Sequence, residues 1–252
     1  FTNIGNVFKV DANGLALSKW KEKGVEFAKL VRGEKPNEKP VAIIQENPED
    51  TTTNLLFFTK EGMVKKTALS EYSLAKASYQ AIKLKDTDEL ISVEIDKPDT
   101  TILFITQNGI GLNADKSDIP VQGRISGGVK GIALGDDDLV VSANQVVAGQ
   151  NVCLVSNKAY AKQINTSEID VMARYRKGVK VFDLKGDNSS GTKVVCSGVF
   201  GEEDDVVIQT EFEEYSAISV KSIAEDTRSS KGKSLSVENN KNIIFAVIRK
   251  NN

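Results

Sequence analysis

The sequence predicts an all-β protein assembled from five copies of one unit, and three observations carry this prediction. A short apolar run, a turn and a second short run recur along the chain. A small residue follows each turn at a nearly constant distance, and helical periodicity is nearly absent. Short apolar runs bounded by turn residues are typical of β-strands, and self-similarity at a period of about 50 residues is typical of a repeat architecture.

The clearest copy of the repeated hairpin is Leu55–Thr67. Its first arm is a continuous apolar run with two phenylalanines, so we expect that arm to be buried on both faces. Gly62 supplies the positive φ that a tight turn needs. The same sequence pattern recurs with other residues at four places: Phe1–Val7, Ile102–Gly109, Val152–Ala159 and Val206–Glu213.

These hairpins define five repeats within a single predicted domain, 1–252, at about 1–45, 54–95, 101–147, 151–200 and 205–249. Downstream of each turn a small residue recurs at a nearly constant distance, and we call it the marker of its repeat. The markers are Gly24, Ser78, Gly128, Gly178 and Gly232. We expect a third strand after each marker, for example at Gln80–Leu84, Val129–Leu134 and Val179–Leu184. We expect a fourth at Leu90–Ile95, Leu139–Ala143, Val194–Val199 and Ile243–Ile248. Four strands in a unit of this length predict a propeller-like ring of blades.

The composition excludes several classes of function. The chain has 252 residues, 40% of them apolar, and no apolar run approaches the roughly 20 residues of a membrane helix, so we expect a soluble protein with no membrane partner. It has no histidine and only two cysteines, which removes the commonest general base and a zinc site. We therefore predict no catalytic residues, metal or cofactor. Cys153 and Cys196 lie in apolar runs typical of a reduced core, although a disulfide between them stays open.

The formal net charge is only −2, but charges sort by position within the repeat. Acids gather in the turn before the fourth strand, as in Asp136–Asp138, where we expect them to be solvated. Cations gather on the strand that leaves the hairpin turn and in the loops around the third strand. If equivalent positions lie at equivalent places on a ring, these cations form one basic edge. The candidate DNA-binding residues are Lys19, Lys21, Lys23, Lys65, Lys66, Lys76, Arg124, Lys130, Lys162, Arg174, Arg176, Lys177, Lys180, Arg228, Lys231 and Lys233.

A curved basic edge suits double-stranded DNA. It would neutralise backbone phosphates without reading bases, and affinity would fall with salt at a slope of about −0.9 per phosphate contacted. The alternative is a propeller that binds a protein partner through its central face or blade tops, with the basic edge incidental. Binding to duplex DNA at low salt distinguishes the two.

Several segments together resemble the C-terminal domain of the A subunit of bacterial type IIA topoisomerases, the family of DNA gyrase and topoisomerase IV. The resemblance covers nearly the whole chain and is weak after Asn188. Its segments are the opening Phe1–Val7, the turn Thr59–Thr67, Ala81–Leu84 followed by Asp88–Ile91, and Gly128–Ile132 followed by Asp138–Val141. It implies a β-pinwheel, a propeller-like ring whose blades exchange strands, with five repeats visible here and a sixth blade undecided.

The resemblance also implies DNA wrapped or bent around a basic outer rim, and as further partners the ATPase B subunit together with the rest of the A subunit. The catalytic Tyr of that family belongs to the N-terminal part of the subunit, so no tyrosine here is assigned that role. The family's gyrase members carry a Gln-Arg-Arg-Gly-Gly-Lys-Gly box, which this chain lacks; Gln122–Gly131 resembles it in content only. Either a box-bearing blade precedes Phe1, or the chain is of the topoisomerase IV type, which Trp20–Gly24 favours. Glu211, Glu213 and Glu214 predict that the fifth repeat contacts DNA least.

Overall fold

The computed structural model describes residues 1–15, 24–47, 49–211, 215–235 and 242–250. These residues form strands with one short α-helix and four short 3-10 helices. The strands are β1 (Asn6–Phe8), β2 (Asn54–Thr59), β3 (Met63–Ala68), β4 (Ser78–Gln80), β5 (Leu90–Ile95), β6 (Thr101–Thr106), β7 (Ile110–Asp115), β8 (Val129–Lys130), β9 (Val140–Val146), β10 (Asn151–Ser156), β11 (Tyr160–Asn165), β12 (Val171–Ala173), β13 (Val179–Lys180), β14 (Val194–Val199), β15 (Asp205–Thr210), β16 (Tyr215–Ser219), β17 (Lys233–Ser234) and β18 (Ile243–Arg249). The helices are α1 (Phe27–Leu30), η1 (Ala12–Gly14), η2 (Leu69–Tyr72), η3 (Thr166–Glu168) and η4 (Val220–Ser222).

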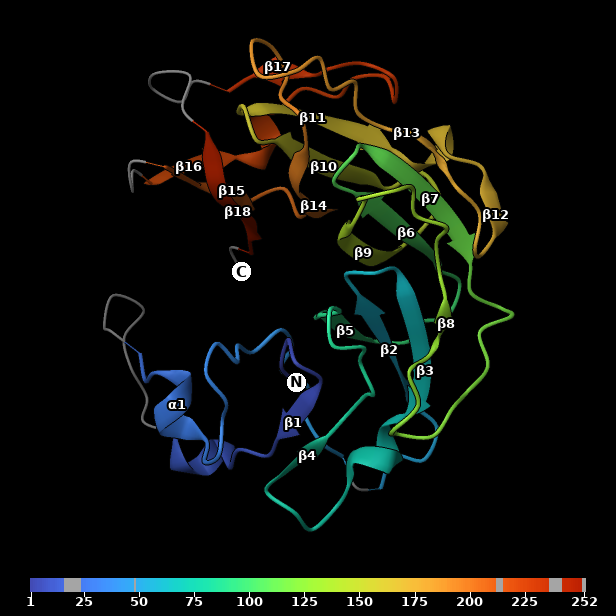
Figure 1. Ribbon diagram of the computed structural model, residues 1–252, viewed down its shortest axis with the longest axis vertical. Helices are drawn as coiled ribbons and strands as arrows, with labels where there is room; N and C mark the ends of the chain where they lie inside the picture. The colour runs from blue at the N-terminus through green and yellow to red at the C-terminus, as the bar shows by residue number, and fades with distance from the viewer. Residues whose placement is uncertain (16–23, 48, 212–214, 236–241, 251–252) are drawn as a thin grey trace. The chain divides into compact units, whose positions relative to one another are not determined.

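Among the described residues, four of the five sheets are built on an antiparallel hairpin, and the fifth pairs β1 with the distant strand β4. The sheet orders are β1–β4, β5–β2–β3–β8, β12–β7–β6–β9 with β13 also on β7, β14–β10–β11–β17, and β16–β15–β18. Figure 1 shows the hairpin of β6 and β7 beside β9 in green. The all-β prediction is confirmed, and the expected fourth strands appear as β5, β9, β14 and β18.

The hairpin arms follow the predicted chemistry. Leu55, Leu56, Phe57 and Phe58 of β2 are fully buried, as expected for an arm covered on both faces. The turn residue Gly62 adopts φ +79°. A side chain at this position would approach Ile132 to 2.8 Å, so glycine is required by its contacts as well as by its backbone.

The outer strand of each of four sheets comes from the following repeat. β4 pairs with β1, β13 with β7, and β17 with β11, all antiparallel, and β8 lies next to β3 in the same sheet. The strand exchange implied by the family resemblance is therefore present. It means that the loop before each exchanged strand lies against the hairpin of the preceding repeat.

The third strand is shorter than predicted. In place of Val129–Leu134, only Val129 and Lys130 join the ladder, because the amides of Gly131 and Ile132 both donate to the carbonyl of Gly62, at 2.8 and 3.3 Å. Val181 and Phe182 share the Gly109 carbonyl in the same way, at 2.7 and 3.2 Å. Two successive amides on one oxygen bend the chain out of the ladder and turn its apolar residues into the core. The first repeat departs further: the helix α1 follows its marker where a strand was expected.

The chain divides into two compact units. The first comprises Phe1–Thr59, Met63–Asp96 and Ile119–Val129, and the second comprises Lys60–Gly62, Lys97–Asp118 and Lys130–Asn252. In the first unit, Leu55, Phe57, Ile82 and Leu90 form the core, and the ring of Phe1 meets that of Phe57 edge to face at 5.4 Å.

The described residues of the second unit include two apolar clusters. One gathers Leu103, Leu154, Ile164 and Phe182 around β6, β10 and β11. The other gathers β10, β14 and β15 and includes Cys153 and Cys196, which are buried and free. The prediction that both cysteines lie in the core is confirmed.

Candidate nucleic-acid interface

Three loops of the same design precede the exchanged strands β8, β13 and β17, and each carries one of the predicted arginines. Each loop begins with a parallel pairing to the preceding hairpin: Val121 with Lys66, β12 with β7, and Glu225 with Gln163. The arginine follows three residues later in each case, as Arg124, Arg174 and Arg228. We call these segments, residues 121–128, 171–178 and 225–232, the arginine loops.

Each arginine reaches back to the exchanged strand of the preceding repeat. The Nη1 atom of Arg174 donates to the carbonyl oxygen of Lys130 at 3.1 Å, and that of Arg228 to the carbonyl oxygen of Lys180 at 2.7 Å. Arg124 makes the equivalent bond to the carbonyl of Gln80. All three side chains are therefore partly engaged in joining neighbouring repeats.

A carboxylate of the preceding repeat anchors each loop. The backbone amide of Arg228 donates to Glu168 Oε2 at 2.9 Å, and that of Arg124 to Glu71 Oε2 at 3.4 Å. Arg174 instead pairs through Nε with Asp118 Oδ1 at 3.1 Å. Sequence reasoning missed these three acids, although their shared place just after the second hairpin arm is a signal that an alignment of the repeats could have found.

Two predicted DNA contacts lie in the protein interior. Lys65 is 1% exposed and Lys162 is 0% exposed. The ammonium group of Lys162 donates to the carbonyl oxygens of Thr227, Arg228 and Ser230. A cation enclosed by protein cannot neutralise a phosphate, so for these two lysines the expectation of direct DNA contact is wrong.

Burial perturbs both amines. It lowers the pKa of Lys65 to about 7, and the nearby Arg124 guanidinium acts in the same direction. Burial lowers the pKa of Lys162 to about 8, while Asp226 is the strongest of the charges that oppose the shift.

Seven of the predicted residues are exposed: Lys76, Lys130, Arg176, Lys177, Lys180, Lys231 and Lys233. All lie in, or directly next to, the loops around the exchanged strands. Lys130 Nζ donates to Tyr175 Oη at 3.0 Å, and Lys180 pairs with Asp183 at 2.9 Å. Apart from Lys76, which precedes β4, these residues lie in or next to the arginine loops, and all seven side chains are open to solvent where an anionic ligand could reach them.

The remaining predicted residues are of two kinds. Lys66 is half-buried and pairs with Asp96 at 2.6 Å. Lys19, Lys21 and Lys23 lie outside the described residues, as does Trp20.

The expectation of solvated acids before the fourth strand is met by Asp136 and Asp137 and is wrong for Asp138. Asp138 is buried, and its Oδ1 accepts from the amides of Leu139 at 2.9 Å and Asn108 at 3.1 Å. This carboxylate ties the fourth strand to the hairpin turn.

Other kinds of site find little support in the described part of the chain. It contains no group of three or more acidic or cysteine residues able to hold a metal ion. None of its helices is both long and apolar enough to cross a bilayer.

The fold and these loops define a class: an all-β, propeller-like protein whose blades exchange an outer strand. The family model of the DNA gyrase C-terminal domain, described as a beta-propeller, matches residues 1–35, 53–95, 100–146 and 150–194. The chain belongs to this family.

The curated relatives of this chain include A subunits of DNA topoisomerase 4 and A subunits of DNA gyrase. The chain is 31% identical over 234 residues to the A subunit of DNA topoisomerase 4 from Bacillus subtilis, a match that covers 92% of this chain and 29% of that protein. It is 32% identical over 215 residues to the A subunit of DNA gyrase from Dehalogenimonas lykanthroporepellens, with 83% of this chain and 26% of that protein covered. The chain thus spans less than a third of the length of either relative.

Solved structures agree with this assignment. The crystal structure of the C-terminal domain of DNA topoisomerase IV matches with a TM-score of 0.87 and 26% identity, over 98% of this chain and 77% of that one. The DNA gyrase A C-terminal domain matches with a TM-score of 0.76 over 98% of this chain and 80% of that one. At 20% identity, the second likeness shows the fold alone.

Proposed function

We propose that residues 1–252 act as one DNA-binding domain of a type IIA topoisomerase A subunit, which bends or wraps duplex DNA along its arginine loops. The observation that carries this proposal is the recurrence of one loop design at Arg124, Arg174 and Arg228, each with exposed cations beside it. Family membership supports it as well.

The proposed contacts are with backbone phosphates and carry no sequence preference. Bending a site of 20–30 base pairs by 40–90° costs on the order of 1–6 kcal/mol, which several phosphate contacts can offset. The proposed contact set is Lys66, Lys76, Arg124, Lys130, Arg174, Arg176, Lys177, Lys180, Arg228, Lys231 and Lys233, with Lys19, Lys21 and Lys23 added from the sequence alone.

In this proposal the domain is not itself catalytic. Its partners are duplex DNA, the ATPase B subunit, and the remainder of the A subunit, which carries the catalytic Tyr, in the bacterial cytoplasm. Relatives include both a topoisomerase 4 and a gyrase subunit. Supercoiling and decatenation assays on the holoenzyme, with the A subunit in its full length, assign the chain to one or the other.

Charge reversal in one arginine loop tests the proposal. Arg176→Glu with Lys177→Glu changes two exposed residues of the loop, and Lys158→Glu with Lys193→Glu makes the same change of charge around the turn between β10 and β11. In mobility-shift titrations on duplex DNA at two salt concentrations, the first pair should weaken binding and reduce the salt slope by about 0.9 for each phosphate that is no longer neutralised. The second pair should change binding much less. Wild-type protein that fails to bind even at low salt would refute the proposal and favour a protein-interaction module.

A further inference from the structure

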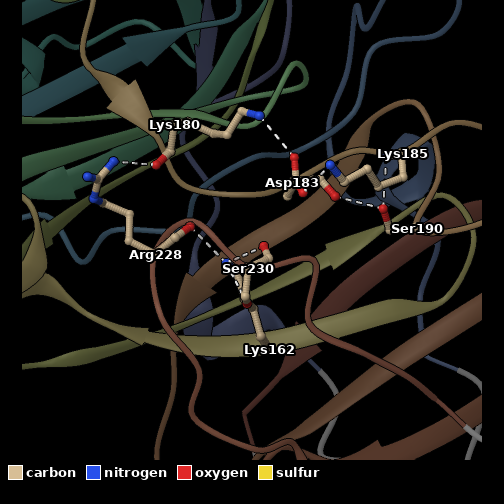
Figure 2. A network of polar contacts seen from close by, with 7 residues as sticks. All are labelled: Lys162, Lys180, Asp183, Lys185, Ser190, Arg228 and Ser230. Carbon is tan, nitrogen blue, oxygen red and sulfur yellow. Dashed lines mark hydrogen bonds and ion pairs between the residues drawn. The ribbon is translucent and has the colours of Figure 1, made fainter.

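The two buried lysines hold the arginine loops from inside. Lys162 lies in β11, yet its ammonium group contacts the loop of the next repeat, at 2.8 Å from the Thr227 oxygen, 2.9 Å from the Arg228 oxygen and 2.8 Å from the Ser230 oxygen. Figure 2 shows Lys162 pointing at the Arg228 and Ser230 backbone, while the Arg228 side chain extends the other way to Lys180. The Lys162 ammonium group thus fixes the backbone of Arg228, and the Arg228 guanidinium group projects from that backbone.

Lys65 does the same in the other unit. It occupies the equivalent position of β3, three residues after the turn glycine, and donates to the carbonyl of Arg124, to the Ala81 oxygen at 2.9 Å and to Tyr72 Oη at 3.2 Å. A buried ammonium group is costly unless its donors are matched, and here three N–H groups meet three oxygens. Aromatic rings contribute too, with Phe57 at 4.8 Å from Lys65 Nζ and Phe182 at 5.2 Å from Lys162 Nζ.

The remaining arginine loop has no such lysine, because Leu112 stands at this position of β7. There a backbone hydrogen bond to the preceding repeat fixes the loop: Tyr175 adopts φ +59°, and its amide donates to the Gly131 oxygen at 2.6 Å. A left-handed backbone is costly for a tyrosine. At the same place in the lysine-held loops, neither Ile125 nor Ser229 has a positive φ. The arginine loops are therefore held in two different ways, by a buried lysine at Arg124 and Arg228 and by a backbone hydrogen bond at Arg174.

We propose that Lys65 and Lys162 are positioning residues of the DNA interface: each fixes the arginine loop of the following repeat so that its cations face the phosphates, without itself touching DNA. This inference rests on the proposed function. The hydrogen bonds from Lys162 set the direction of the Arg228 side chain and of the exposed Lys231 and Lys233. These residues belong to the same short segment as the carbonyl groups that Lys162 contacts.

Lys162→Leu in the whole chain tests this, since Leu112 shows that leucine fits the equivalent position. Binding to a fluorescent duplex, measured by anisotropy at several salt concentrations, should weaken about tenfold, and the salt slope should fall by about 1 for each phosphate that the loop no longer reaches. Lys193→Leu, which removes one positive charge outside the arginine loops, is the matched control and should change affinity much less. A folded Lys162→Leu protein with unchanged affinity would overturn the proposal.

A second variant separates positioning from charge. Ser229→Gly, added to Lys162→Leu, lets the loop adopt the left-handed backbone that Tyr175 uses in the leucine-bearing repeat. The double variant should recover most of the affinity although no charge is restored. A deficit that Ser229→Gly does not recover would assign the effect to the missing charge and contradict positioning.

The remaining outcomes are also decisive. Lys65→Leu repeats the test at an independent loop, and unfolding of both lysine variants would mean that these residues serve stability alone, which overturns the inference. Wild-type protein that does not bind DNA would refute the proposed function. If wild type binds and reversal at Arg176 and Lys177 weakens it, while Lys162→Leu has no effect, only the positioning role fails.

Discussion

The close approach of the exchanged strand to its host hairpin predicts an unequal response to two identical substitutions. Gly178 precedes β13 and has φ +73°, and a Cβ there would lie 2.4 Å from the Gly111 carbonyl oxygen on the facing strand β7. Gly149 has a similar φ of +77°, but nothing lies within 4 Å of a Cβ built there. Both alanine variants incur the left-handed backbone cost, and only Gly178→Ala adds a clash with backbone.

The magnitudes follow from these two terms. The left-handed conformation costs a non-glycine residue roughly 1–2 kcal/mol, which is the whole expected effect of Gly149→Ala. An oxygen that is part of the backbone cannot rotate away, so relief requires a backbone shift of the kind that costs about 1–3 kcal/mol in overpacked sites. Gly178→Ala should therefore lower the free energy of unfolding by about 2–5 kcal/mol, and by more than Gly149→Ala.

Urea unfolding followed by far-ultraviolet circular dichroism measures both effects on one scale. The two glycines lie in the same compact unit, so differences between units do not enter the comparison. Equal losses of stability for Gly178→Ala and Gly149→Ala would refute the reasoning, because they would mean that the exchanged strand can move away from β7 at no cost.

Two further predictions concern buried titratable groups. Because burial lowers the pKa of Lys65 to about 7 in the folded protein, well below the ordinary value of a lysine, folding releases a proton above pH 7. The free energy of unfolding of wild type relative to Lys65→Met should then rise with pH above 7, by at most about 1.4 kcal/mol per unit, and a pH-independent difference in urea titrations would contradict this. Burial also raises the pKa of the Cys196 thiol to about 12 and that of Cys153 as well, so neither should react with a thiol reagent at pH 8 until denaturant is added. Stoichiometric labelling of native protein would show that one of them is accessible.

The sequence was sufficient to predict the hairpins and most fourth strands, because their signals are local. Gly62 with its apolar arm predicted both a turn and a fully buried strand. The length of the third strand was not predictable in this way. A continuous apolar run such as Val129–Leu134 is compatible with a strand that stays in the sheet or one that turns into the core, and the choice depends on the carbonyl of Gly62, distant in sequence.

In the candidate site, too, some features could be predicted from local sequence and others depend on residues distant in the chain. Lys65 and Lys66 are adjacent and chemically alike, yet one is enclosed and the other pairs with Asp96 near the surface. Alternation along the strand could not separate them, because β3 buries residues on both of its faces. What distinguishes Lys65 is the set of oxygens around it, and the Arg124 carbonyl among them comes from the next repeat. The sequence was sufficient to find the cations of the loops. It could not show which of them are exposed and which are buried against the next repeat, because that depends on the exchanged strands.

The near-neutral total charge fits an anion-binding surface because acids and cations have different tasks in these repeats. Glu71, Asp118 and Glu168 anchor the arginine loops, and Asp138 accepts from two backbone amides. A carboxylate already engaged by amides or a guanidinium repels a phosphate less than a free one does. Cations such as Arg176, Lys177 and Lys231 lie exposed in the loops that those acids fix. A net charge of −2 therefore coexists with a positive field local to each loop, and that local field is what a salt titration of DNA binding would measure.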